Sequence, residues 1–436
     1  MAKTLRRAGL TLGAIVVMGA IGYTALVQYG LHKSYPQALQ PESGAALQDQ
    51  IKRGEYVARL SDCTACHTAQ GGQAFAGGYR LETLFGAILS SNITLDKETG
   101  IGNWTQEQFD RAVRHGVGSH GYLYAAMPYN AYAKLTDRDL TDLWAYIRTI
   151  PAVKNEVVKN QLPFPFNQRW TLAGWNLMLF DDAVFKPTLN KSAEINRGAY
   201  LVDGPGHCAA CHTSKNLLGG DSNSYLQGGT LEGWHAPDLT PNPHVGLGSW
   251  NQGDIVSYLK SGTNRFTASS GPMTEAVENS TQYMTDDDLR AIASYLQSLP
   301  ASSGVQPAPV AASDTAMIVG KKVYESQCNA CHVSNGSGIR KMIPTLANNP
   351  QMNSADPSSL LNVVLKGSQG PLTHANPTAA GMPDFAWKLS DSNIPDVMTY
   401  TRNSWGNAAA PVTSDMVAKA RANLQAKSWA GGSQSQ

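Results

Sequence analysis

The stretch GPGHCAACH, residues 204–212, holds the pattern from which the rest of the chain can be understood. Two cysteines, Cys208 and Cys211, are separated by two residues and followed at once by His212. This spacing allows two thioether bonds to the vinyl groups of a haem and places an imidazole beneath its iron. The stretch therefore predicts a covalently attached c-type haem.

The same pattern occurs twice more in the chain. It is formed by Cys63, Cys66 and His67 in CTACH, and by Cys328, Cys331 and His332 in CNACH. The chain has six cysteines, so none is left for a disulfide or a free thiol. A zinc site would need four tetrahedral ligands and gives no reason for the histidine, and a redox dithiol is expected on a βαβ unit that the sequence does not show. We therefore expect three haems.

Length and composition agree with several small domains. A chain of 436 residues is long enough for roughly three domains of about 100 to 150 residues. The formal net charge is +1 with 15% charged residues, and no Lys/Arg cluster stands out. This balance argues against nucleic acid as a partner.

The N-terminus predicts a membrane anchor. Residues 1–8 are basic, whereas Gly9 to Val27 carry no charge. This run is near the length that crosses a bilayer and longer than a usual signal-peptide core, so we favour an uncleaved anchor, with a removed signal peptide as the alternative. Lys3, Arg6 and Arg7 would stay in the cytoplasm. The expected location is the bacterial inner membrane, with the body of the protein on the periplasmic side.

The chain also repeats itself around the three motifs. Each motif follows a short helical segment and precedes an amphipathic helix that begins near Leu135, Met284 or Leu389. In these closing helices a Thr or Ser before Asp forms the N-cap, and apolar residues recur at helical spacing. The predicted fold is all-α, with three tandem cytochrome c domains after an N-terminal transmembrane helix.

The expected organisation follows from these repeats. It comprises an N-terminal anchor or signal with linker (1–45), domain 1 (46–152), an aromatic-rich connector (153–194), domain 2 (195–300), a Pro/Ala/Ser linker (301–315), domain 3 (316–410) and a C-terminal tail (411–436). The connector's aromatic residues are explained either by packing within their own domains or by a surface for the membrane, a quinone or a partner subunit.

Each unit offers a methionine as the sixth ligand of its iron. A thioether suits haem iron opposite histidine and raises its reduction potential. Met127, Met273 and Met382 are each expected on a loop between the haem motif and the closing helix. The histidines outside the motifs show no repeated position and are interpreted as surface or local hydrogen-bonding residues.

Several longer stretches resemble one known family. They are NRGAYLVDGPGHCAACHTSKNLLGG (196–220), LQGGTLEGWHAPDLTPN (226–242), MPDFAWKLSD (382–391) and YTRNSWGNAAAPV (400–412). They are similar to the triheme cytochrome c subunits of membrane-bound dehydrogenases of acetic acid bacteria, which serve alcohol, aldehyde, gluconate, sorbitol and fructose dehydrogenases. The resemblance covers nearly all of the chain after residue 45.

The resemblance implies a function and a set of partners. The catalytic subunit would be a separate chain with pyrroloquinoline quinone, flavin or molybdopterin, accompanied in some complexes by a small iron-sulfur or accessory subunit. The cytochrome would pass electrons to ubiquinone and oxidise no substrate by itself. The haem ligands implied are the Cys and His of the three motifs with Met127, Met273 and Met382. The retained N-terminal helix resembles the cytochromes of molybdopterin aldehyde dehydrogenases, which favours an aldehyde dehydrogenase.

Two alternatives remain open at this point. One is a multihaem redox enzyme with an open position on one iron, which three candidate methionine ligands disfavour. The other is a haem subunit that feeds a terminal oxidase instead of delivering electrons to quinone.

Overall fold

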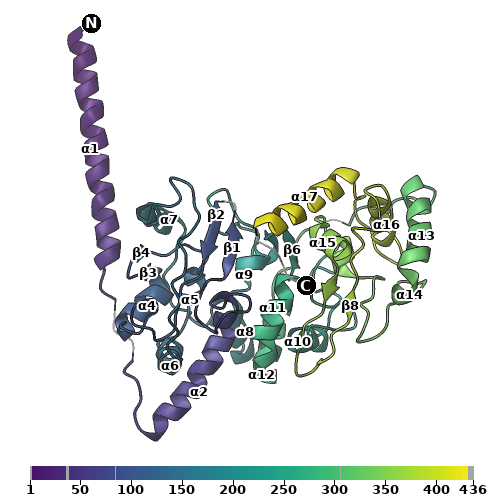
Figure 1. Cartoon of the computed structure of the whole chain (residues 1–436), viewed down its shortest axis with the longest axis horizontal. Helices are drawn as coiled ribbons and strands as arrows, with labels where there is room; N and C mark the ends of the chain where they lie inside the picture. The colour runs from purple at the N-terminus through teal and green to yellow at the C-terminus, as the bar shows by residue number, and fades with distance from the viewer. Residues whose placement is uncertain (1, 36–38, 84, 305, 431–436) are drawn as a thin grey trace. The chain divides into compact units, whose positions relative to one another are not determined.

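The computed structural model describes residues 2–35, 39–83, 85–304 and 306–430 (Figure 1). Parts of the expected anchor and linker region, of the Pro/Ala/Ser linker and of the C-terminal tail therefore lie outside the described residues. The side chains of Lys3, Arg6 and Arg7, on which the expected orientation rests, are also outside the description. The chain divides into two compact units, which are Met1–Glu55 with His67–Phe185 and Tyr56–Cys66 with Lys186–Gln436.

Unit 1 contains the N-terminal helix, most of the first haem-binding region and most of the connector. Its elements are α1 (Ala2–His32), most of α2 (Ala45–Leu60), β1 (Arg80–Thr83), β2 (Gly86–Leu89), α4 (Gln106–His115), β3 (Val117–Gly118), β4 (Gly121–Tyr122), α5 (Tyr129–Tyr132), α6 (Asp137–Ile147), η1 (Arg169–Thr171) and α7 (Leu172–Leu179).

Unit 2 contains the second and third haem-binding regions. Its first half holds α3 (Cys63–Cys66), α8 (Ala193–Asp203), α9 (Ala209–His212), β5 (Gln227–Leu231), β6 (Trp234–Asp238), α10 (Gln252–Ser261), α11 (Pro272–Asn279), η2 (Thr281–Tyr283) and α12 (Asp286–Gln297). Its second half holds α13 (Thr315–Gln327), α14 (Asn329–His332), η3 (Pro350–Asn353), α15 (Ser358–Lys366), β7 (Ser368–Gln369), β8 (Gly381–Met382), α16 (Asn393–Thr401) and α17 (Ser414–Ala430).

The expected helical fold is confirmed, with short hairpins added to it. Within the described ranges the strands form four antiparallel two-stranded pairs, β1–β2, β3–β4, β5–β6 and β7–β8. All of them are short, and the rest of the regular structure is helical. The hairpins lie between the haem motifs and the closing helices, where the sequence is rich in glycine.

A glycine on the opening helix lets each helix pair cross closely. A Cβ atom at Gly54 would lie 1.9 Å from the carbonyl oxygen of Asp142 in α6. In unit 2 the corresponding distances are 2.0 Å from Gly198 to Ala291, in the pair α8–α12, and 2.1 Å from Gly320 to Asp396, in the pair α13–α16 (Figure 1). Any side chain at these positions would push the helices apart, so the same crossing recurs three times.

Two of the three closing helices begin with the hydroxyl caps that their sequences predict. The hydroxyls of Thr136 and Thr285 accept hydrogen bonds from the backbone N–H groups of Asp139 and Asp288. Each of these caps satisfies a donor that the first helical turn leaves unpaired. The cap expected at Ser390 is wrong, because α16 begins only at Asn393 and its N-cap residue, Ser392, makes no side-chain cap hydrogen bond. The Ser390 hydroxyl still accepts from the N–H of Asn393 at 3.1 Å, before the helix.

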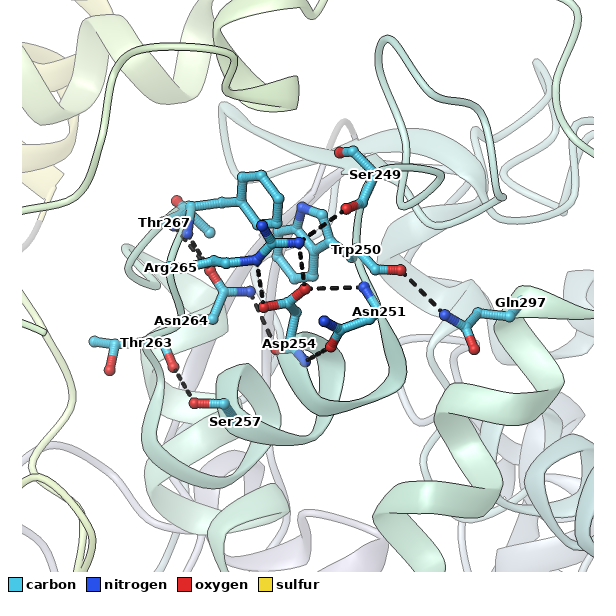
Figure 2. A network of polar contacts seen from close by, with 11 residues as sticks. Ser249, Trp250, Asn251, Asp254, Ser257, Thr263, Asn264, Arg265, Thr267 and Gln297 are labelled. Atoms are coloured by element: carbon cyan, nitrogen blue, oxygen red, sulfur yellow. Dashed lines mark hydrogen bonds and ion pairs between the residues drawn. The ribbon is translucent and has the colours of Figure 1, made fainter. Parts of the chain in front are cut away.

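A second repeated helix is fixed at both ends. In α4 a capping box joins Thr105 and Gln108, and in α10 the corresponding pair is Asn251 and Asp254. Figure 2 shows the second box, where Arg265 also binds the Asp254 carboxylate at 2.9 and 3.0 Å. Its neighbour Trp250 is held by a hydrogen bond from Gln297 in α12. These contacts tie α10 to the closing helix of the same haem unit.

The second and third haem-binding regions share polar contacts within unit 2. The His244 Nε2 atom lies 3.1 Å from the carbonyl oxygen of Ala408, and the Asn353 amide donates to the His244 carbonyl. The Ser359 hydroxyl accepts from the N–H of His235 and donates to its carbonyl. These bonds connect the second haem-binding region directly to the third.

The Pro/Ala/Ser linker and the expected C-terminal tail differ in structure. Residues 301–304 and 306–311 contain no helix or strand, as expected of the Pro/Ala/Ser linker. The segment expected as a tail instead contains α17, whose Val417 is fully buried against α15 and α16. Arg421 of α17 also donates to the carbonyl oxygens of Ala386 and Leu389, so this helix belongs to the third haem region.

Candidate haem-binding sites

The histidine of each motif is oriented by one hydrogen bond to the backbone. The Nδ1 atoms of His67 and His212 lie 2.7 Å from the carbonyl oxygens of Ser91 and Pro237, and that of His332 lies 3.3 Å from Pro344. A carbonyl oxygen only accepts, so Nδ1 carries the proton in these bonds. The other ring nitrogen, Nε2, is then left with the lone pair that a metal ligand needs.

The carbonyls that accept these bonds occupy equivalent places in the first two haem regions. Ser91 and Pro237 each precede a residue, Asn92 or Asp238, whose side-chain oxygen accepts from a backbone N–H two residues further on. The bonds are 2.9 Å to Thr94 and 2.6 Å to Thr240. This small turn fixes the direction of the carbonyl and, through it, the plane of the imidazole.

The surroundings keep these groups neutral. Desolvation lowers the pKa of His67, His212 and His332, and the backbone hydrogen bond of each opposes this only in part. Desolvation also raises the pKa of the Cys63 and Cys208 thiols to about 12. A reactive dithiol requires a lowered thiol pKa instead. The donor set therefore fits thioether attachment better than a reactive dithiol.

The geometry also fits haem rather than a protein-only metal centre. Among the described residues, no three His, Cys, Asp or Glu side chains come together as a metal-binding group. Each motif instead offers two thiols and one imidazole with a free Nε2, which is the donor set of a c-type haem. The chain thus carries three covalently bound haem c groups, which change oxidation state by one electron each.

The three candidate methionines stand in different local structures. Met127 lies in the turn before α5, as expected of a loop. Met382 ends the two-residue strand β8 and pairs with Ser368. Met273 is not on a loop, because it lies in the first turn of α11 directly after Pro272. Proline at the first position of a helix is pre-organised for the helical conformation, which explains the difference. All three side chains are partly buried.

Glycines bring the methionine segments close to the rest of their sites. A Cβ atom at Gly271, just before α11, would lie 2.6 Å from the ring of Trp234 in β6, the strand that also holds Pro237. In the third site a Cβ atom at Gly367 would lie 2.6 Å from the carbonyl oxygen of Met382. Both glycines have positive φ. Glycine is therefore needed at each position for two reasons, which are its freedom to adopt positive φ and its lack of a Cβ atom.

The first and second motifs approach one another within unit 2. Helix α3, which holds Cys63 and Cys66, contacts α11, and the Cys211 thiol is close enough to contribute to the raised pKa of Cys66. The Ser280 hydroxyl donates to the Leu60 carbonyl at 3.4 Å, and Tyr56 donates to Asp288 at 2.7 Å. The attachment edges of two haems are therefore neighbours.

Sequence reasoning alone did not find the residues that position the ligands. Ser91, Pro237 and Pro344 act through backbone carbonyls, which no side chain reveals. Their only signal is the repeated position before Asn92 and Asp238. The remaining histidines include His235 and His244, which make the local contacts described above.

Family comparisons agree with three haem domains. The family described as Cytochrome c matches residues 195–300 and 318–405. The family described as Cytochrome C oxidase, cbb3-type, subunit III matches residues 49–147. Each matched range contains one Cys-x-x-Cys-His motif.

Curated relatives match over most of the chain. The gluconate 2-dehydrogenase cytochrome c subunit of Pantoea cypripedii is 40% identical over 393 residues, covering 85% of this chain and 89% of the relative. The alcohol dehydrogenase (quinone) cytochrome c subunit of Gluconobacter oxydans is 42% identical, covering 87% and 84%. The fructose dehydrogenase cytochrome subunit of Gluconobacter japonicus is 37% identical, covering 88% and 85%.

Proposed function

Because this chain belongs to the cytochrome c subunits of membrane-bound dehydrogenases, we propose that it carries electrons from a separate catalytic subunit to ubiquinone. The observation that supports this most is the repeated histidine geometry, since Nδ1 of His67, His212 and His332 is bound to a carbonyl in every motif. Three haem-attachment motifs, each with an oriented histidine, suit a carrier of electrons. The protein contributes ligands, burial and orientation to the haems.

The proposed iron ligands pair one histidine with one methionine in each unit. They are His67 with Met127, His212 with Met273, and His332 with Met382. A full set of six ligands leaves no position for a substrate, which argues against a multihaem enzyme. The position of Met273 in α11 keeps it between the second motif and the closing helix α12, so its pairing with His212 is retained.

Direct exchange of electrons between the first two haems is part of this proposal. The approach of Cys66 to Cys211 supports a short path between these two porphyrin edges. The third haem is bound within the same unit of the fold as the second. Electrons would thus pass along three haems in one polypeptide before they reach the quinone.

The membrane attachment is proposed to be α1, with the haem domains on the periplasmic side. Residues Ala14–His32 of α1 are long and apolar enough to cross a bilayer, by length and composition. Their exposed apolar side chains, including Val16, Met18 and Ile21, are more than half exposed. Such a surface suits lipid rather than water.

The partner's substrate is proposed to be an aldehyde, on the strength of the apolar N-terminal helix α1 as an uncleaved anchor. The names of the relatives give gluconate, alcohol and fructose as alternatives. None of these substrates would touch the cytochrome. The choice depends on the catalytic chain that binds to it.

Affinity purification of this chain from membranes in mild detergent tests the proposal. The co-purified protein is analysed for molybdenum, pyrroloquinoline quinone and flavin, and substrate-dependent reduction of the haems and of ubiquinone is followed by absorbance. Molybdenum with aldehyde-dependent haem reduction is the expected result. Pyrroloquinoline quinone or flavin would replace the aldehyde by an alcohol or a sugar-type substrate. Purification with a terminal oxidase and no dehydrogenase would overturn the proposed function.

A further inference from the structure

The connector carries an apolar helix that is fixed to the N-terminal helix. Helix α7 lies beside the C-terminal part of α1 (Figure 1). The Tyr23 hydroxyl of α1 donates to the carbonyl oxygens of Trp170 and Thr171 at 3.0 and 3.2 Å, and accepts from the N–H of Gly174 at 3.2 Å. A Cβ atom at Gly174 would already lie 3.3 Å from that hydroxyl. The two helices are therefore in direct contact.

A buried cluster strengthens this contact. Val27 of α1 and Ala173 of α7 are buried together with Val117 and Tyr122. The Tyr122 hydroxyl also donates to the Val27 carbonyl at 3.2 Å. Helix α7 is thus held against residues 23–27 of α1.

The face of α7 that adjoins α1 exposes large apolar side chains. Leu177 and Met178 follow Gly174 by three and four residues, so they lie on the same side of the helix as the contact with Tyr23. They are 71% and 63% exposed, and Trp170 is 50% exposed. From residue 170 to residue 180 the sequence has no charged side chain. We call Trp170, Leu177 and Met178 the α7 face.

The nearest positive charge is turned towards the protein. The Arg169 guanidinium donates to the Tyr122 carbonyl at 2.7 Å and lies 5.0 Å from the centre of the Tyr124 ring. The charge of Arg169 is therefore bound to the protein next to the α7 face. On the side of α1 that carries Tyr23, Val16 lies two turns earlier and is 63% exposed, so apolar side chains are exposed on this side of α1 as well as on the α7 face.

Helix length places this face at the edge of a bilayer. At about 1.5 Å per residue, Tyr23 lies roughly 24 Å along the axis from Arg7, whereas a hydrocarbon core is about 30 Å thick. We take the uncharged run from Gly9 to Val27 as the spanning part, with the basic N-terminus at one surface. Residues 23–27 then reach the opposite boundary. That boundary is where Trp and Tyr side chains gather in membrane proteins.

We propose that the α7 face inserts into the outer interfacial layer of the lipid bilayer beside α1, as a second membrane contact. This inference rests on the proposal that α1 spans the membrane. The contact holds the first haem region against the lipid surface, where ubiquinone dissolves. Another side of α7 packs on Tyr129, whose ring contacts Trp175 and whose hydroxyl donates to Asn176 Oδ1 at 2.8 Å, so α7 is held by the protein while the α7 face stays exposed.

Cysteine labelling tests the proposal because the chain lacks any other free thiol once its six cysteines hold haem. Leu177→Cys is compared with Val158→Cys, a control position in the same unit that is 64% exposed. The full-length holoprotein is placed in nanodiscs of phosphatidylethanolamine and phosphatidylglycerol and treated with a charged, water-soluble maleimide. Intact mass then gives the labelling rate of each variant.

The thiol at position 177 should react at least about tenfold more slowly than the thiol at 158, because an apolar environment disfavours the thiolate. The same protection is expected for the chain alone and for the complex with its catalytic subunit. Equal labelling rates at the two positions would overturn the proposal. Protection of position 177 found only in the complex would also overturn it, because the partner subunit and not the membrane would then cover the α7 face.

Alkaline carbonate extraction of wild-type membranes tests separately whether α1 anchors the chain in the membrane. Release of the chain would overturn α1 as the anchor, and the α7 contact with it. Retention of the chain with equal labelling rates would overturn the α7 contact alone. Electron delivery to ubiquinone is measured independently of both.

Discussion

The methionine proposed as the sixth ligand of an iron is the side chain that should affect the midpoint potential of its haem most. Met382→Ala should lower the midpoint potential of the third haem by on the order of 100 mV, because a methionine thioether favours the reduced iron. Met342→Ala is the matched control, since this methionine belongs to the same region and is 59% exposed. Redox titration followed by absorbance measures both variants. An unchanged potential in Met382→Ala would remove this residue from the ligand set.

A buried carboxyl in the first haem region makes stability depend on pH. The Asp110 Oδ1 atom is buried without a hydrogen-bond partner, and desolvation raises the pKa of this group to about 7. The charge of Arg114 opposes the shift, whereas Asp137 and Glu107 add to it. The folded state therefore binds more protons than the unfolded state between pH 4 and pH 7, and stability falls as pH rises.

Asp110→Asn removes the charge that has to be buried above pH 7. We expect the variant to be about 1–2 kcal/mol more stable than wild type at pH 8, after allowance for partial solvent screening. At pH 4 the two proteins should have equal stability. Thermal unfolding at both pH values measures the effect, with Asp49→Asn as a control because the Asp49 side chain is 70% exposed. A gain that is the same at both pH values would contradict the titration of Asp110.

At the scale of helices, the close crossing of α13 and α16 leaves no space for a methyl group. Gly320→Ala would place a Cβ atom 2.1 Å from the Asp396 carbonyl oxygen and should cost about 1–3 kcal/mol of unfolding free energy, as overpacking does. Gly253→Ala in α10 is the control, because the nearest atom there is the side-chain oxygen of Asn251 at 3.2 Å. Chemical denaturation of the holoprotein compares them. Equal stability of the two variants would show that the helices separate without cost.

Helical elements were predictable from the sequence where their signals are local. Apolar spacing and a Thr–Asp cap foretell α6 and α12, since both signals lie within one helix. The crossing glycines could be seen only as a repeated letter, because the carbonyl that each one meets lies far along the chain. The hairpins were missed because strands of two to five residues show no periodicity. Helix α17 was missed because its stability comes from burial of Val417 against α15 and α16 rather than from its own pattern.

The haem sites divide in the same way. Cysteines and histidines were readable from a five-residue motif. The structural setting of Met273 was not, since Pro272 begins a helix where a loop was expected. The carbonyls of Ser91, Pro237 and Pro344 come from tertiary structure, and backbone groups carry no sequence signature.

For the whole molecule, the neighbouring first and second motifs predict electrical coupling. A charge gained by one iron should change the potential of the other by on the order of 1 kcal/mol, or some tens of millivolts, at an effective dielectric constant near 20. Spectroelectrochemical titration should therefore show two haems with mutually dependent midpoints. Met273→Ala should shift the second midpoint and, to a smaller degree, the first. Independent one-electron curves in both proteins would contradict the close approach of Cys66 and Cys211.

The way in which Tyr56–Cys66 folds with unit 2 limits how this gene can be divided. The three repeats look like interchangeable modules, yet a break in the connector would leave Tyr56 and α3 on one fragment and their partners, α12 and α11, on the other. The opening segment of the first repeat therefore depends on the second repeat for its contacts. A recombinant fragment designed to hold the first haem must therefore extend through α12, and domain shuffling among related cytochromes can exchange this pair but not its first member alone.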